Sequence, residues 1–218
     1  MLFVVLAFSL NASADNYFDN SLFSPDPSCD NVTYAGEIST AGFGCGEYDV
    51  PELSNISEPS GGSGDLEIIW ISRPGPEYSW QVIPGANGLS YDPGIITETT
   101  QFRRCARRSG CDSYVGESNI VTVEVYTSME LSCNCTAASE WEGSNGSVEV
   151  VVSGGTGPFT YDWGSGPTSM SSMSNLPAGV YPVTVTDSNG CTAWTECCVQ
   201  HPPNPVFCEG FRTQTQGG

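Results

Sequence analysis

Short stretches of alternating apolar and polar residues, separated by Gly- and Pro-rich turns, constrain the fold of this chain more than any other feature. Val121, Val123 and Val125 alternate with polar residues, a period of two that is typical of a half-buried β-strand. No window of the sequence keeps the 3.6-residue apolar period of an amphipathic helix. The sequence therefore predicts an all-β fold built from several short strands.

Strand-like runs in the first half of the chain alternate with turn signals at regular intervals. The runs cover residues 66–71, 78–83, 99–106 and 119–126, and Gly- or Pro-rich segments separate them. This spacing is typical of a β-sandwich. It predicts a first module over residues 49–127, with Trp70 and Trp80 as large apolar side chains of its core.

A second module is predicted over residues 129–198. Alternating valines at 148, 150 and 152 and an alternating run at 180–186 indicate strands. The sequence Asp187-Ser188-Asn189-Gly190 predicts a hairpin turn, and Trp163 is the candidate core residue. The whole pattern therefore predicts two small tandem immunoglobulin-like β-sandwich modules, stabilised by disulfides.

The two ends of the chain have compositions of their own. Residues 2–10 are apolar and precede Ala12-Ser13-Ala14, so residues 1–14 are interpreted as a secretory signal peptide. No basic segment precedes the apolar run, so the natural start could lie upstream of Met1. Residues 15–48 are polar and are predicted as an irregular, Cys-containing segment. Residues 199–218 are predicted as a Pro-rich linker and the truncated start of a further segment. We therefore expect export to the cell surface or beyond, without insertion into the membrane.

The ten cysteines of an exported chain predict disulfides rather than a metal site. Neither Cys133-Asn134-Cys135 nor Cys197-Cys198 has the spacing of a zinc ribbon, and the single histidine, His201, stands beside prolines. We predict Cys29 to pair with Cys45, and Cys105 with Cys111. Cys133 or Cys135 is expected to reach Cys191 or the adjacent pair, with three connectivities left open. The disulfide candidates are Cys29, Cys45, Cys105, Cys111, Cys133, Cys135, Cys191, Cys197 and Cys198.

Charge and the scarcity of histidine exclude several classes of function. The chain has 25 acidic residues against 6 basic ones, a formal net charge of −19, which disfavours nucleic acid as a partner. Nucleophilic catalysis of the Ser-His-Asp kind needs a positioned histidine, and His201 lies in the linker. A glycosidase needs two carboxylates across a cleft, and two small modules leave no domain to form one. We therefore expect no enzyme activity, no catalytic residues and no cofactor.

Three weaker ligand hypotheses remain. Calcium is the ion that the acidity favours, but the turn at Asp187 lacks the later acidic ligands of a calcium loop. The arginines at 103, 104, 107 and 108 point to both faces of a strand, so they cannot form one patch. Salt bridges to the acidic surface are the favoured interpretation, with an anion-binding or inter-module contact as the alternative. Tyr161, Trp163 and Trp194 could form a platform for surface polysaccharide, although Trp163 is better suited to the core.

The second module resembles the SprB repeat over residues 147–192. The matching motifs are Gly154-Gly155-Thr156, Tyr161-x-Trp163, Ala178-Gly179-x-Tyr181 and Asp187-x-Asn189-Gly190-Cys191. That repeat belongs to large surface adhesins of gliding Bacteroidetes. The Ser- and Met-rich residues 169–174 and the presence of a single copy depart from the pattern. The resemblance implies a gliding-motility adhesin whose partners are the neighbouring modules of the same parent protein.

The first module resembles an immunoglobulin-like domain of secreted proteins from the same phylum. The residues that carry this resemblance include Ile69-Trp70, Ile83-Pro84-Gly85-Ala86 and Tyr91-Asp92-Pro93. Both resemblances imply an outer-membrane export route such as type IX secretion. Two functions follow as expectations: a non-catalytic structural or adhesive module, or an accessory or carbohydrate-binding region of a larger secreted hydrolase.

Overall fold

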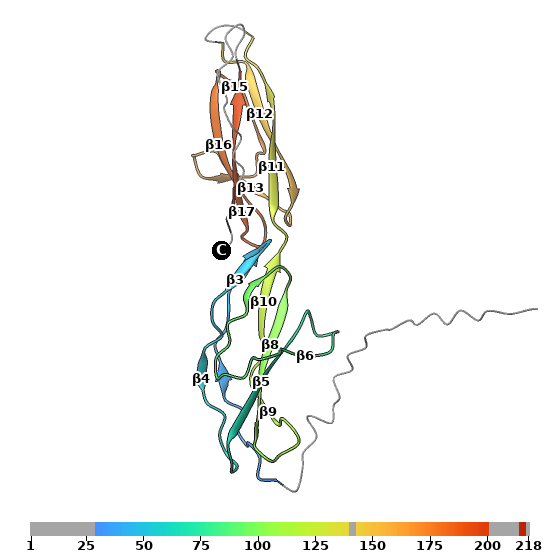
Figure 1. Cartoon of the computed structure of the whole chain (residues 1–218). Helices are drawn as coiled ribbons and strands as arrows, with labels where there is room; N and C mark the ends of the chain where they lie inside the picture. Colours follow the sequence, from blue (N-terminus) through green and yellow to red (C-terminus); the bar gives the residue numbers. More distant parts are fainter. Residues whose placement is uncertain (1–28, 140–142, 201–213, 217–218) are drawn as a thin grey trace, which may run out of the picture.

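Two modules built only from β-strands lie end to end in the computed structural model (Figure 1). The structure describes residues 29–139 and 143–200, together with the backbone of residues 214–216. Module one comprises residues 29–126, and module two comprises residues 129–200 with the strand at 214–216. The predicted fold class, all-β with two tandem disulfide-stabilised sandwiches, is confirmed.

Module one packs a large sheet against two short ribbons. The sheet has the order β2-β10-β8-β5-β6, with β9 added to β8, and the ribbons are β1-β4 and β3-β7. Pairing is antiparallel except between β2 and β10, which run parallel. The strands are β1 (Glu37–Ile38), β2 (Phe43–Cys45), β3 (Tyr48–Val50), β4 (Asn55–Ser57), β5 (Leu66–Arg73), β6 (Gln81–Val82), β7 (Gly94–Ile96), β8 (Thr100–Arg108), β9 (Gly116–Glu117) and β10 (Val121–Tyr126).

The core of module one contains Trp70, as predicted, but not Trp80. Alternation along β5 directs Trp70 inward, where it is fully buried and its indole N–H donates to the carbonyl of Gly88. Trp80 precedes β6 and stacks against Arg73, with 4.3 Å between the guanidinium carbon and the ring centre. Arg73 alternates with Trp70 and lies on the outer face of the sheet, so Trp80 covers that face.

Residues 29–48, predicted as an irregular segment, contribute regular structure to module one. They include β1 and β2 and the beginning of β3, and Val32 and Ile38 belong to the same core cluster as Trp70. The strands here are only two or three residues long, which is too short to show a period in the sequence. Module one therefore begins by Cys29 rather than at residue 49.

Module two is a sandwich of a three-stranded and a five-stranded sheet. The sheet orders are β11-β12-β15 and β14-β13-β16-β17-β18, all antiparallel. The strands are β11 (Met129–Thr136), β12 (Gly146–Gly154), β13 (Thr160–Asp162), β14 (Pro167–Thr168), β15 (Ser172–Leu176), β16 (Gly179–Thr186), β17 (Thr192–Val199) and β18 (Gln214–Gln216). Alternating valines on β12 and β16 fill the space between the sheets, and Trp163 packs against their edge. The hairpin predicted at Asp187 is confirmed, since it joins β16 to β17.

Candidate functional site

The junction between the modules contains two covalent connections. Only Thr127 and Ser128 separate β10 of module one from β11 of module two. A second covalent connection runs beside them, because Cys45 on β2 forms a disulfide with Cys191, which immediately precedes β17. The two α-carbons are 5.9 Å apart, and both cysteines are buried. The modules are therefore joined at two points rather than one.

The parallel pairing of β2 with β10 places Cys45 at the junction. The register sets Cys45 opposite Tyr126, the last residue of β10. The next N–H, that of Gly46, donates to the carbonyl of Tyr126 at 2.7 Å. Gly44 is required here, since a β-carbon at this position would come within 2.2 Å of the β-carbon of Tyr48. Cys45 thus reaches module two from a fixed strand and not from a free loop.

On the other side of the junction, the buried carboxylate of Asp187 shapes the turn that carries Cys191. One oxygen accepts the backbone N–H groups of Asn189 and Cys191, at 2.8 and 2.9 Å. The other oxygen accepts the N–H of Thr156 at 3.0 Å. A carboxylate that accepts several backbone donors holds a turn in one conformation. Asp187 therefore positions the sulfur that bonds to Cys45.

Apolar contacts continue the core of module two across the junction. Cys45 belongs to the buried cluster of module two, and Tyr126 packs against that cluster. The rings of Phe43 and Tyr126 meet edge to face, with centres 5.6 Å apart. The hydroxyl of Tyr126 donates to the carboxylate of Glu124, and this bond raises the pKa of Tyr126. The junction is therefore packed as well as covalently linked.

The remaining cysteines show which predicted pairings were correct. Cys29 bonds to Cys111 and Cys133 to Cys197, so the predicted pairs Cys29 with Cys45 and Cys105 with Cys111 are wrong. Cys133 bonds to Cys197, one of the partners that the prediction left open, and Cys198 is also disulfide-bonded. Cys191 bonds to Cys45 and not to Cys133 or Cys135, so that part of the prediction is wrong, as is the choice of Cys105 and Cys135 as disulfide candidates. Cys105 and Cys135 are free, Cys105 buried and Cys135 exposed. Burial raises the pKa of the Cys105 thiol to about 12.

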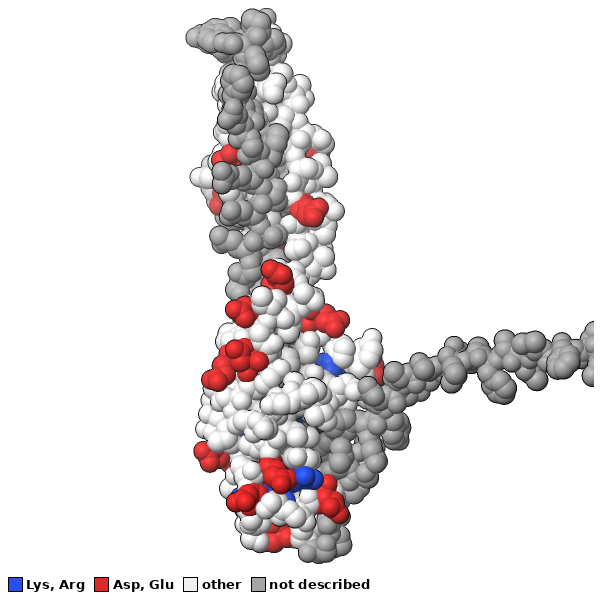
Figure 2. All heavy atoms as spheres, viewed as in Figure 1, with Lys and Arg blue, Asp and Glu red and all other residues white. Residues whose placement is uncertain are grey.

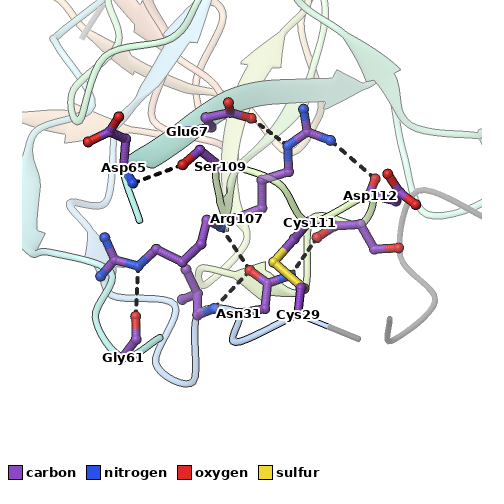
Figure 3. Close-up of a disulfide and its surroundings, with 12 residues drawn as sticks. Cys29, Asn31, Gly61, Asp65, Glu67, Arg107, Ser109, Cys111 and Asp112 are labelled. Atoms are coloured by element: carbon purple, nitrogen blue, oxygen red, sulfur yellow. Dashed lines mark hydrogen bonds and ion pairs between the residues drawn. A yellow bond between two sulfur atoms is a disulfide. The ribbon is translucent and has the colours of Figure 1, made fainter. Parts of the chain in front are cut away.

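The Cys29–Cys111 bridge closes the far end of module one (Figure 3). Beside it, the side chain of Asn31 donates to the carbonyl of Ser113 and accepts the N–H of Arg108. Arg107 pairs with Glu67 at 2.6 Å and donates to the carbonyl of Asp112. The chain entering module one is therefore fixed to the β8–β9 loop by a disulfide and by side-chain hydrogen bonds.

The arginines divide between two faces of β8, as their spacing predicted. Arg103 and Arg107 lie on the outer face, where they pair with Glu117 and Glu67. Arg104 points inward and is fully buried, and no pattern in the sequence predicted a buried arginine. Figure 2 shows acidic side chains over both modules, whereas every described arginine belongs to module one.

Arg104 links the β1–β4 ribbon and the β6–β7 loop of module one to its main sheet. The guanidinium donates to the carbonyls of Ser57 and Leu89, at 2.9 and 2.7 Å, and to the side chain of Asn55. Burial lowers the pKa of Arg104, and the nearby carboxylate of Glu58 partly offsets this effect. Gly36 makes room for it, because a β-carbon there would lie 2.6 Å from a guanidinium nitrogen. Arg104 is thus a structural residue of the core, with no access for an anionic ligand.

The proposed polysaccharide platform is not assembled as predicted. Tyr161 is buried, and Trp163 packs against the core while its indole N–H donates to Met170. Trp194 lies apart from them in a shallow groove of about 220 Å³ on the outer face of β13, β16 and β17. Asp162, Thr184 and Trp194 stand opposite one another across these strands. One aromatic ring, one hydroxyl and one carboxylate are what this groove offers a ligand.

The described residues contain no group of three or more His, Cys, Asp or Glu side chains that could hold a metal ion. Both carboxylate oxygens of Asp187 are engaged by backbone donors, so the turn serves as a hairpin. Among the described residues, no helix is long and apolar enough to cross a membrane.

Comparisons with known families match a part of each module. Residues 34–127 match a domain of unknown function (DUF8696). Residues 142–168 match the SprB repeat. The resemblance of the second module is therefore confirmed for its first half. The SprB match and the disulfides are consistent with an extracellular or cell-surface protein.

Comparisons with individual proteins add little to these matches. The comparison with curated proteins gives no match. Among solved structures, the N-terminal four Ig domains of Dscam1 isoform 6.44 align with 81% of this chain at 12% identity and a TM-score of 0.36. This chain covers 47% of that one. At that TM-score the likeness supports no inference about function.

Proposed function

We propose that the two modules form a rigid, non-catalytic spacer within a larger cell-surface protein, of the kind that serves as an adhesin in gliding Bacteroidetes. The Cys45–Cys191 bridge carries this proposal, because it adds a second covalent link beside a two-residue connection. Modules joined by one short linker can hinge about it, whereas a second attachment point removes that freedom. The SprB match supports the adhesin context. Neighbouring modules of the parent protein are the proposed partners.

The arrangement of reactive groups supports a role without catalysis. Of the two free thiols among the described residues, Cys105 is buried and has a raised pKa, so it is a poor nucleophile. The buried polar side chains Arg104 and Asp187 are committed to backbone partners. Neither of these two side chains lines the groove at Trp194.

Relative tumbling of the two modules tests the spacer proposal. NMR relaxation on the oxidised chain should give one rotational correlation time for both modules. The variant Cys45→Ala/Cys191→Ala should show the modules tumbling partly independently, while the matched control Cys135→Ala, which removes a free exposed thiol, should behave as wild type. Independent tumbling in the oxidised wild-type chain would refute the spacer.

A second candidate function is weak binding of surface polysaccharide at the Trp194 groove. Aromatic rings stack on the apolar faces of sugars, and the Asp162 and Thr184 side chains beside the ring could bond to hydroxyls. Repetition in a larger protein would raise such an affinity through avidity. Retention on insoluble polysaccharides, lost in Trp194→Ala and kept in Trp80→Ala, would support this function. A simple spacer should show no retention. Retention would also fit an accessory region of a larger hydrolase.

A further inference from the structure

We infer that the disulfides make the module pair a tether that transmits tension from one end to the other and lengthens only to a short covalent limit when it unfolds. The inference extends the proposed spacer role from rigidity at rest to resistance under load. The resistance to load depends on how the bridges overlap along the chain. This overlap is separate from the contribution of the bridges to the free energy of unfolding.

The three bridges with both cysteines among the described residues overlap along the sequence. Cys45 lies inside the loop closed by Cys29 and Cys111, and its partner Cys191 lies beyond that loop. Cys133 likewise lies inside the loop closed by Cys45, and its partner Cys197 lies outside it. Every residue from Cys29 to Cys197 is thus enclosed by at least one bridge. The predicted local pairs would have left residues 46–104 and 112–132 outside any loop they closed.

Two short covalent routes therefore run from Cys29 to Cys197. One crosses to Cys111, follows the backbone to Cys133 and crosses to Cys197, a route with about 22 residues of backbone. The other follows the backbone to Cys45, crosses to Cys191 and continues to Cys197, again with about 22 residues of backbone. Either route spans about 80–90 Å when fully extended, bridges included. Without bridges, the same stretch of chain would extend to about 550–600 Å.

The second half of the first route is already extended in the folded molecule. It includes β10 and the first part of β11, which are joined by Thr127 and Ser128. Strands rise by about 3.3 Å per residue, close to the limit of a stretched chain. Little slack therefore remains between Val121 and Cys133, so the part of the route that can still lengthen is the segment from Cys111 to residue 120.

Single-molecule stretching of the full chain, with handles at its two ends, tests this inference. In the oxidised protein, unfolding should lengthen the stretch from Cys29 to Cys197 by less than about 90 Å. In reductant, the same stretch should gain more than about 450 Å. Removing one bridge, as in Cys45→Ala/Cys191→Ala, should leave the oxidised limit unchanged, because the other route remains.

Two variants with four substitutions each provide a matched comparison. Loss of Cys45–Cys191 together with Cys133–Cys197 should allow an extended length of about 300 Å, because both routes are broken. Loss of Cys29–Cys111 together with Cys133–Cys197 should keep the wild-type limit, since the route through Cys45 and Cys191 survives. If either variant does not fold, the oxidised and reduced wild-type chains still decide the question.

The outcomes separate this inference from the spacer proposal. Lengthening of the oxidised wild-type chain by several hundred ångströms, or equal lengthening of the two four-substitution variants, would overturn the tether. That result would leave the spacer intact if the modules tumble together at rest. Modules that tumble independently at rest but reach the same short limit under load would refute the spacer and retain the tether.

Discussion

Removing the inter-module bridge should cost a predictable amount of stability. Cys45 and Cys191 are 146 positions apart, and as a lone bridge they would stabilise the fold by about 5 kcal/mol through loop-closure entropy. The other bridges shorten the loop that remains in the unfolded chain. From Cys45 it runs back to Cys29, across to Cys111, on to Cys133, across to Cys197 and back to Cys191.

That shortened loop contains about 44 residues, which lowers the expected contribution to about 4 kcal/mol. We therefore predict that Cys45→Ala/Cys191→Ala lowers the free energy of unfolding by about 4 kcal/mol. Alanine is the appropriate replacement, because both cysteines are buried and a serine hydroxyl would lack a partner there. The reasoning treats the bridge as a constraint on the unfolded chain and assigns no energy to the contacts around it.

Guanidinium denaturation, followed by tryptophan fluorescence in the absence of reductant, measures this difference. Cys135→Ala is the control, and it should change the free energy of unfolding by no more than about 0.5 kcal/mol because the thiol is free and exposed. A loss of less than about 1 kcal/mol in the double variant would refute the reasoning. Peptide mapping of the oxidised protein should independently recover a Cys45–Cys191 cross-link.

Three further predictions concern single residues. Arg104→Leu should destabilise the fold by about 3–5 kcal/mol, because it leaves buried carbonyls unpaired. The control Arg103→Leu, on the other face of β8, should destabilise it by about 1 kcal/mol. Thermal denaturation of the two variants measures the difference. At pH 8 a thiol reagent should label Cys135 and not Cys105, because the pKa of about 12 keeps the Cys105 thiol protonated. Mass spectrometry measures the labelling, and equal labelling of the two cysteines would contradict this prediction. Asp187→Ala should cost about 2–4 kcal/mol in denaturation because three backbone N–H groups lose their acceptor, more than Asp162→Ala in its exposed turn.

Strands long enough to repeat a period were predictable, and the shorter ones were not. The alternation around Val123 and Val150 identified β10 and β12, and the turn at Asp187 identified the β16–β17 hairpin. β1 and β2 contain two and three residues, so no period can appear in them. These two strands belong to module one because they pair with strands that are distant in the sequence, as β2 pairs with β10. A local sequence pattern does not predict such pairing.

The disulfide across the junction could not be predicted from the sequence for a related reason. Cysteine pairing follows spatial proximity, and the sequence favoured partners close along the chain, such as Cys29 with Cys45. The structure instead places Cys45 beside Cys191 through the parallel register of β2 on β10. Arg104 was likewise indistinguishable from Arg103, because adjacent residues of a strand face opposite ways and the inward face was not assigned. Trp80 was predicted as a core residue because its side chain is large and apolar, but its position next to β6 places it on the outer face of the sheet.

The distribution of cysteines indicates that the two modules form one folding unit. Module one closes its own bridge between Cys29 and Cys111, and module two closes its own between Cys133 and Cys197. Cys45 and Cys191 instead bond to each other across the junction, and both are buried. Either module produced alone would therefore lack the partner of its cysteine, together with the apolar contact around Tyr126. The module that contains the match to the domain of unknown function is therefore covalently joined to the module that contains the match to the SprB repeat.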